Sequence, residues 1–260
     1  MHNVLSLIVE AKKKQVEILK KNHDELLSLV KKAPKPLGFK ETINREGKIS
    51  FIAEIKQASP SAGVLRKEFS AVDIARIYQA AKVNALSVVT ESEFFLGKIN
   101  YLEDIKKEID LPVLRKDFIL DEIQILESRT VGADAILLIM RILDEEKLPR
   151  LYNFSKELGM DVMIEIHTEK ELRKVLKLGS FDIIGINNRN LNTLKVDLIT
   201  TQKLAPFIPQ GVVKVSESGI KSLKDVLWLK GVGIDAILVG ETLMKAGNIE
   251  EKIKELHVDA

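Results

Sequence analysis

The 260-residue sequence contains no cysteine. This absence excludes disulfides, thiolate nucleophiles and thiolate metal sites, and it is typical of proteins from a reducing compartment. Histidines are few, and their positions have no metal-ligand spacing: His2, His23, His167 and His257. We therefore expect a protein without a metal site.

Neither charge is in excess, since 40 Lys and Arg residues stand against 38 Asp and Glu residues. No overall field therefore attracts nucleic acid or an anionic membrane, and we expect neither as a partner. Lysine runs occur at 12–14 and 31–32, but acidic residues are interspersed and aromatic residues make up only 5%. We interpret these runs as solvated faces.

Long apolar runs are absent as well. The apolar stretch 4–9 is too short for a signal peptide and is followed by Glu10. The stretch 135–140 is far below the roughly 20 residues that a membrane span needs. We therefore expect a cytoplasmic protein. Its length allows one large α/β domain or two smaller ones, and a hydrophobic content of 45% allows a substantial core.

A pattern that recurs in the second half of the chain indicates parallel strands. A small residue is followed two positions later by an acid and then by a short apolar run, starting at Gly132, Gly159, Ser180 and Gly233. Glycine commonly ends a helix, and unbroken apolar runs suit strands that are covered on both faces. Four further candidate strands cover 51–56, 85–90, 112–116 and 212–216. Eight strands are the number that a (β/α)8 barrel requires.

Helical patterns fill the gaps between these strands, at 73–81, 121–131, 144–158, 169–178, 197–204 and 222–229. An open doubly wound sheet is the competing architecture, but regular units without a glycine-rich dinucleotide loop favour the closed barrel. An amphipathic helical stretch over 4–32 precedes the first strand and ends before Pro34. We expect it to pack on the barrel rather than on a membrane or a partner. The predicted organisation is an N-terminal helical extension, 1–48, on a barrel, 49–260, as a single domain.

Polar residues collect at the carboxyl ends of the predicted strands, where barrel enzymes have their active sites. They are Glu54, Lys56, Lys116, Glu165, Asn187, Ser216 and Ser218. Glu54 and Lys56 point to the same side of an otherwise apolar strand, and burying unpaired charge is unfavourable. A structural ion pair would explain these two residues alone. The gathering of polar residues at one end favours a functional role.

Two glycine-containing loops predict a phosphate site. Gly219 follows the seventh strand and Gly240 follows the eighth, so that backbone N–H groups can approach a dianion. Arg189 can add a bidentate contact. Glu241 is unexpected beside a phosphate. An acid in a first helical turn complements the helix dipole, however, and we expect its side chain to point outward.

These motifs together resemble those of the indole-3-glycerol-phosphate synthase family. The matching segments occur in the family's order and cover nearly the whole chain, at 52–61, 114–119, 164–166, 185–191 and 215–220. The resemblance implies a (β/α)8 barrel and a carbon-carbon lyase of tryptophan biosynthesis. The family converts 1-(2-carboxyphenylamino)-1-deoxyribulose 5-phosphate to indole-3-glycerol phosphate by ring closure and loss of carbon dioxide and water. The resemblance implies no cofactor, because the nitrogen-conjugated ring of the substrate supplies the electrons for ring closure.

The resemblance also implies roles for individual residues. Lys116 would be the general acid and Glu165 its carboxylate partner, while Lys56 would hold the substrate carboxylate or share the acid role. Residues that position substrate and catalysts would be Glu54, Asn187 and Ser218. The phosphate end would be lined by Ser59, Arg189, Gly219, Gly240 and Glu241, and the aromatic ring and linker by Pro60 and Phe95. Physical chemistry favours the same division, because a lysine flanked by carboxylates stays protonated and can donate a proton.

Some points remain open from the sequence. Gln57, Ala58 and Glu241 depart from common family residues, and Glu241 replaces a serine of some relatives. His167 lies on the strand face of Glu165, either contacting substrate or standing at the rim. The sequence fits a monomer or a weak homodimer that binds a phosphorylated small molecule.

Three other functions compete with this interpretation. The isomerase of the neighbouring pathway step uses a cysteine, which this chain lacks. A Schiff-base aldolase would use Lys56 or Lys116 as its nucleophile. A non-catalytic sensor of phosphorylated ligands would have lost the charged residues at the strand ends, and these are present.

Overall fold

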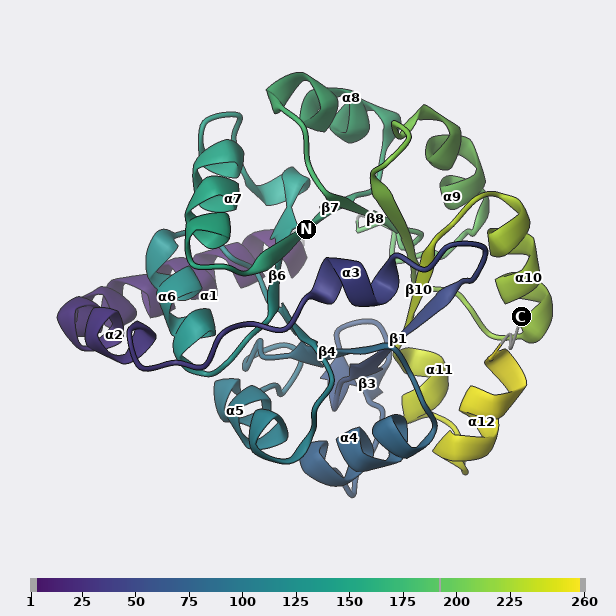
Figure 1. Cartoon of the computed structure of the whole chain (residues 1–260), viewed down its shortest axis with the longest axis horizontal. Helices are drawn as coiled ribbons and strands as arrows, with labels where there is room; N and C mark the ends of the chain where they lie inside the picture. The colour runs from purple at the N-terminus through teal and green to yellow at the C-terminus, as the bar shows by residue number, and fades with distance from the viewer. Residues whose placement is uncertain (1–3, 192, 258–260) are drawn as a thin grey trace.

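Eight parallel strands form a closed barrel in the computed structural model, which describes residues 4–191 and 193–257 (Figure 1). The neighbour order is β1-β10-β9-β8-β7-β6-β5-β4. The strands are β1 (Ser50–Ile55), β4 (Ala85–Val89), β5 (Val113–Lys116), β6 (Ala135–Ile139), β7 (Asp161–Ile166), β8 (Ile183–Asn187), β9 (Val213–Glu217) and β10 (Ala236–Val239). The predicted (β/α)8 barrel and its eight strands are confirmed, with small differences at the strand ends.

Helices surround the barrel. They are α4 (Ala71–Ala80), α5 (Ile99–Glu108), α6 (Glu122–Thr130), α7 (Lys147–Glu157), α8 (Glu169–Leu178), α9 (Ile199–Leu204), α10 (Leu223–Gly231), α11 (Glu241–Met244) and α12 (Ile249–Leu256). Two predicted helices begin later than expected, because the acid at the expected start accepts hydrogen bonds from the following N–H groups instead of joining the helix. These acids are Asp144 and Asp197. The helices α5, α11 and α12 were not predicted from the sequence. Short 3-10 turns are η2 (Met140–Ile142) and η3 (Ala205–Phe207).

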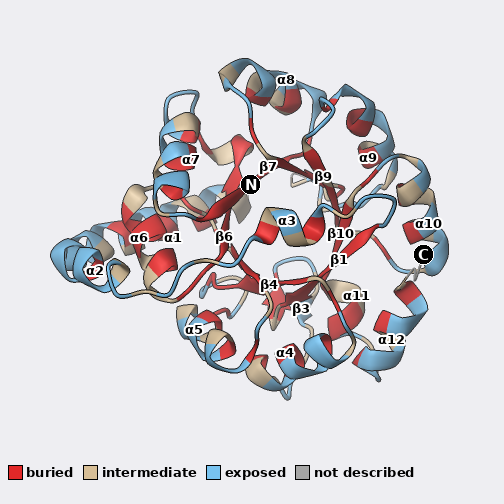
Figure 2. Ribbon diagram, in the orientation of Figure 1, coloured by how far each residue is buried: buried red, intermediate tan, exposed pale blue. Residues whose placement is uncertain are grey.

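The strands are buried on both faces, as their unbroken apolar runs predict (Figure 2). Side chains such as Ile52 and Val215 fill the barrel, and others such as Val88 and Ile164 pack against the helices. No helix within residues 4–191 and 193–257 is long and apolar enough to cross a membrane.

The short helix α3 (Phe39–Ile43) closes the amino end of the barrel and crosses its centre in Figure 1. Phe39 and Ile43 are fully buried against the apolar side chains inside the barrel. The recurring acids of the sequence pattern fix this segment. Asp134 accepts a hydrogen bond from the N–H of Leu37 at 2.7 Å, and Asp161 accepts one from the N–H of Lys40 at 2.9 Å. The repeated acid therefore serves the fold.

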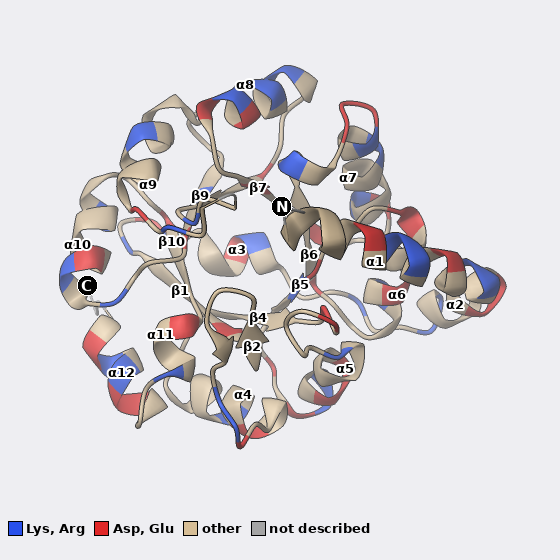
Figure 3. Ribbon diagram, turned by 180° about the vertical axis from the view of Figure 1, so that it is seen from behind, with Lys and Arg blue, Asp and Glu red and all other residues tan. Residues whose placement is uncertain are grey.

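The N-terminal helices lie on the other side of the molecule. They are α1 (Val4–Leu19) and α2 (His23–Val30), and the 3-10 turn η1 (Lys20–Asn22) interrupts the single helix expected over 4–32. Figure 3 shows α1 in front of the barrel, seen from behind the view of Figure 1. Val16 and Leu26 pack against α6. Lys12 does not belong to a solvated face as expected, because it is buried and its Nζ lies 2.7 Å from Asp117.

A small hairpin follows β1. Its strands β2 (Ala58–Ser59) and β3 (Gly63–Val64) pair antiparallel, and Pro60 lies in the turn between them. The N–H of Ala58 donates to the carbonyl of Phe95 at 3.2 Å. The hairpin is thereby attached to the loop after β4.

Candidate active site

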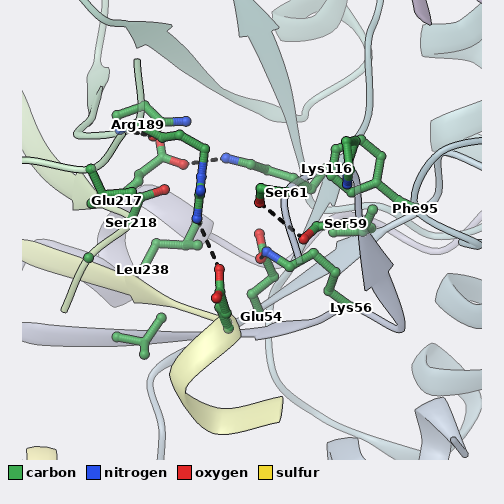
Figure 4. A pocket seen from close by; sticks show the side chains of 18 of the residues that line it. Glu54, Lys56, Ser59, Ser61, Phe95, Lys116, Arg189, Glu217, Ser218 and Leu238 are labelled. Carbon is green, nitrogen blue, oxygen red and sulfur yellow. Dashed lines mark hydrogen bonds and ion pairs between the residues drawn. The ribbon is translucent and has the colours of Figure 1, made fainter. Parts of the chain in front are cut away.

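A pocket of about 690 Å³ opens at the carboxyl ends of the barrel strands. Its lining includes the site residues that the family resemblance implies: Glu54, Lys56, Ser59, Pro60, Phe95, Lys116, Glu165, Asn187, Arg189, Ser218, Gly219, Gly240 and Glu241. Figure 4 shows Lys56, Lys116 and Arg189 pointing into this space from different strands and loops. The apolar residues Val4, Leu5 and Ile8 of α1 complete one wall.

Lys116 lies between two carboxylates at the centre of the pocket. Its Nζ is 2.9 Å from Oε2 of Glu165, and it also donates a short hydrogen bond to Oε2 of Glu217. Burial opposes the charge of this ammonium group, but the carboxylates of Glu165 and Glu217 outweigh burial and raise the pKa of Lys116. Lys116 is therefore positively charged at neutral pH.

The two carboxylates that share Lys116 differ in their protonation. Burial favours the neutral form of Glu165, but Lys116 and His167 outweigh it and lower the pKa of this carboxyl group. Burial of Glu217, reinforced by the charge of Glu165 and only partly offset by Lys116, raises the pKa of Glu217 to about 7. Neighbouring carboxyl groups whose pKa values are driven apart are typical of acid-base sites. At neutral pH Glu165 is ionised, whereas Glu217 is close to its titration point.

Sequence reasoning missed Glu217 and assigned the end of its strand to Ser216 and Ser218. Ser216 faces the helical layer, where its hydroxyl lies 2.8 Å from that of Thr201 and accepts a hydrogen bond from Asn188 at 3.0 Å. Alternation along β9 gives the signal that could have found Glu217. Val213 and Val215 point into the barrel, so Glu217 must do so as well.

The first strand supplies an ion pair to the same pocket. Nζ of Lys56 is 2.5 Å from Oε1 of Glu54, and both side chains are largely buried. The hydroxyl of Tyr78 donates to the backbone carbonyl of Glu54 at 3.1 Å and holds this strand end in place. The pair is therefore an ion pair, as its spacing suggests, and it also faces the cavity.

Glycines make room for two of the carboxylates. A Cβ atom on Gly240 would lie 2.3 Å from Oε1 of Glu54, and one on Gly185 would lie 2.4 Å from Oε1 of Glu217. Such distances are far below van der Waals contact, so a larger residue at either position would displace its carboxylate. Gly185, in β8, and Gly240, directly after β10, thus leave the space that these two carboxylates occupy.

The loop after β9 has an unusual backbone. Ser218 and Gly219 have φ angles of 68° and 87°, and a Cβ atom on Gly219 would lie 2.4 Å from Val196. Consecutive residues in this conformation turn their N–H groups to one side, as anion-binding loops do. Arg189 stands nearby, also lining the pocket.

Glu241 does not point outward as expected. Its carboxylate accepts a hydrogen bond from Arg189 at 2.9 Å and one from Lys245 at 2.6 Å. Burial opposes its charge, but Lys245 and Arg189 outweigh burial and lower the pKa of Glu241. The two cations neutralise the acid and hold it at the edge of the pocket.

The opposite side of the pocket is apolar. The rings of Phe95 and Phe118 lie 6.1 Å apart between centroids, and Leu137 and Ile139 contribute from β6. Pro60 closes this side from the hairpin. The pocket thus offers both apolar side chains suited to a planar ring and cationic side chains. Within residues 4–191 and 193–257, no group of three or more His, Asp or Glu side chains has a geometry that could hold a metal ion.

A family sequence model and individual relatives of the chain carry the same protein name. The sequence model of the family "Indole-3-glycerol phosphate synthase" matches residues 5–256. Proteins of this name from Thermoanaerobacter sp. (strain X514) and Acetivibrio thermocellus are 48% and 49% identical to the chain over 259 and 221 residues. These matches cover 99% and 85% of this chain, and 98% and 85% of the respective relatives.

A solved structure is similar in fold. It is 3-hexulose-6-phosphate synthase from Salmonella typhimurium, which superposes with a TM-score of 0.58 over 80% of this chain and 96% of the other. At 17% sequence identity, this similarity shows only that the two proteins share the barrel fold.

Proposed function

The chain belongs to the indole-3-glycerol phosphate synthase family, and we propose that Lys116, held between Glu165 and Glu217, is the proton donor of its reaction. The protein is a decarboxylating, ring-closing lyase of tryptophan biosynthesis. It converts 1-(2-carboxyphenylamino)-1-deoxyribulose 5-phosphate to indole-3-glycerol phosphate. The observation that carries the proposal is the buried, doubly paired ammonium group at the centre of the pocket.

Ring closure needs a proton on the ketone oxygen. The aryl carbon that bears the carboxylate attacks the ketone carbon, and the carbonyl π electrons move to the oxygen, which takes a proton from Lys116 and becomes a hydroxyl group. The carbon–carboxylate bond then breaks, releasing carbon dioxide and restoring the aromatic ring. Glu165 stabilises the ammonium group before transfer and directs it toward the oxygen.

Dehydration completes the reaction. The new hydroxyl group leaves as water after taking a proton, while the carbon next to the nitrogen loses one. Glu217 can serve here as acid or base, because its pKa is raised to about 7. Lys56 holds the aryl carboxylate before it is lost, and Glu54 orients Lys56. Asn187 and Ser218 line the same cavity and position the substrate.

The phosphate group would occupy the polar end of the pocket. Arg189 would contact it by a charged hydrogen bond, together with the backbone at Gly219 and Gly240 and the side chain of Ser59. Glu241 keeps Arg189 in place until the dianion arrives. The ring would lie on the apolar side, against Phe95 and Pro60.

Replacing Arg189 by alanine should raise KM by roughly 10–100-fold, since a hydrogen bond to a charged group contributes about 1.5–3 kcal/mol. Turnover at saturation should change little, because Arg189 does not contact the reacting carbons in this arrangement. Steady-state kinetics measures both constants. Arg173→Ala is the control, because that arginine is exposed on α8 and pairs with Glu169. An unchanged KM for Arg189→Ala would move the phosphate elsewhere.

Borohydride trapping distinguishes proton transfer from Schiff-base chemistry. A nucleophilic lysine needs a lowered pKa, whereas the carboxylates around Lys116 raise its pKa. Incubation of the enzyme with substrate and borohydride should therefore give no covalent adduct in intact-mass spectra. An adduct on Lys116 or Lys56 would replace the proposed mechanism by an aldolase-type one.

Localisation, domain organisation, oligomeric state and binding partner are also part of the proposal. We propose a cytoplasmic protein of a single domain, with residues 1–48 as its helical extension. We propose a monomer or a weak homodimer. The nearly balanced charge supports a phosphorylated small molecule as the partner, rather than nucleic acid or a membrane.

A further inference from the structure

His167 contacts the active-site carboxylate Glu165 but does not line the pocket. It follows β7, and its side chain is only 3% exposed. The pocket lining does not contain it, so it neither contacts the cavity nor stands at its rim, the two roles considered from the sequence. A buried histidine next to a catalytic carboxylate can act only through that carboxylate.

Each ring nitrogen of His167 faces a different acid. Nε2 lies 3.3 Å from Oε1 of Glu165, and Nδ1 lies 3.4 Å from Oε2 of Glu171, so that both contacts are ion pairs and not well-directed hydrogen bonds. A neutral imidazole has one N–H donor and one acceptor, so it would turn a lone pair toward one of these carboxylates. Only the doubly protonated, positively charged ring suits both neighbours.

We call the arrangement of Glu165, His167 and Glu171 the clamp. The turn from β7 into α8 holds it together. Thr168 caps the helix and accepts a hydrogen bond from the N–H of Glu171 at 3.2 Å. The carboxylate of Glu171 reaches back and accepts the N–H of His167 at 2.6 Å. Strand end, histidine and first helical turn therefore hold one another in a fixed geometry.

Charged groups from other elements surround this clamp. Lys116 of β5 binds the second oxygen of Glu165, and Glu217 of β9 lies beyond it. The charge of Arg141, in η2, also favours the ionised form of Glu171. Glu165 thus stands between Lys116 and His167, with one oxygen facing each, whereas within residues 4–191 and 193–257 Glu217 forms an ion pair with Lys116 alone.

We propose that His167 and Glu171 are positioning residues that keep Glu165 ionised and aimed at Lys116. This inference rests on the proposed role of Lys116 as proton donor.

The electrostatics of the clamp agree with its geometry. Burial disfavours the imidazolium form, but Glu165 and Glu171 outweigh burial and raise the pKa of His167 to about 9. A group with a raised pKa stabilises the fold below its unfolded pKa, and this contribution is lost as the pH rises through the folded value. The clamp is therefore closed at neutral pH and opens near pH 9.

Three variants test the proposal: His167→Gln, Glu171→Gln and, as a matched control on the same helix, Glu169→Gln, whose acid is exposed and pairs with Arg173. His167→Gln should lower kcat about tenfold, with KM changed less than about twofold, and should move the acidic limb of the kcat profile up by about one pH unit. Glu171→Gln should move the alkaline limb down by about one pH unit. The control should retain the wild-type profile.

A purely structural role would lower kcat without moving either limb, and that result, or a wild-type profile for His167→Gln, would overturn the proposal. If His167→Gln does not fold, the limb shift of Glu171→Gln decides in the same way. NMR titration of the wild-type imidazoles is independent of turnover. A His167 ring still charged at pH 8 supports the clamp, and one that titrates at or below its ordinary value of about 6.5 refutes it. Wild-type enzyme without turnover would instead refute the proposed function.

Discussion

Replacing Lys116 by alanine should lower kcat by roughly 10²–10⁴-fold, the usual contribution of a positioned general acid. The ketone oxygen would lose its proton donor, and water would have to take this role in a cavity that is partly apolar. The fold should remain intact, because Glu165 and Glu217 can share a proton once the lysine is removed. Steady-state turnover and circular dichroism measure the two effects.

Lys106→Ala is a matched control for this experiment. Its side chain is 15% exposed, against 14% for Lys116, and it also pairs with a buried acid, Asp134 at 2.8 Å. Asp134 precedes β6 at the amino end of the barrel, away from the pocket. The control should retain wild-type kcat. A Lys116→Ala enzyme with kcat within about tenfold of wild type would remove Lys116 from the acid role.

Replacing Glu217 by glutamine should impair activity and stabilise the fold at the same time. We expect kcat to fall by about 10–100-fold, because dehydration loses the group that can give or take a proton near neutral pH. Stability should rise because a buried acid whose ionisation is unfavourable becomes a neutral amide. Active sites commonly trade stability for function in this way.

The pH dependence of this stabilisation follows from the raised pKa of Glu217, about 7 against an ordinary 4.5. Below pH 4.5 the carboxyl is neutral in both states, so variant and wild type should be similarly stable. Between pH 4.5 and pH 7 the carboxyl group of Glu217 is ionised in the unfolded chain but not in the folded protein. Wild type therefore loses stability relative to the variant as the pH rises. Above pH 7 the difference should be constant and on the order of 1 kcal/mol or more. Denaturant unfolding at pH 4.5 and pH 8 checks this, and a difference that shrinks with pH would contradict it.

Much of the fold was predictable because its strands are largely apolar runs, four of which begin after a small residue and an acid. The start of the helix α5 carries no capping signal, because Lys98 makes no side-chain cap. Lys12 was wrongly assigned to a solvated face. Its position on an amphipathic helix gives no indication of Asp117, the distant acid that makes its burial possible.

The residues around the pocket were predictable from their positions at strand ends, but their electrostatics were not. Glu217 could have been found from the alternation of Val213 and Val215, and it was hidden by the serines beside it. The state of His167 depends on Glu171, which reaches it only because α8 turns back at Thr168. Which carboxylate holds a proton is a property of burial and neighbours in space.

The most direct measurement is turnover of 1-(2-carboxyphenylamino)-1-deoxyribulose 5-phosphate by the wild-type protein, followed by indole fluorescence and by carbon dioxide release. With no cofactor added, one carbon dioxide should be released for each indole-3-glycerol phosphate formed. Binding of the compound without fluorescence or carbon dioxide would contradict the account, and it would leave the barrel as a sensor of phosphorylated ligands.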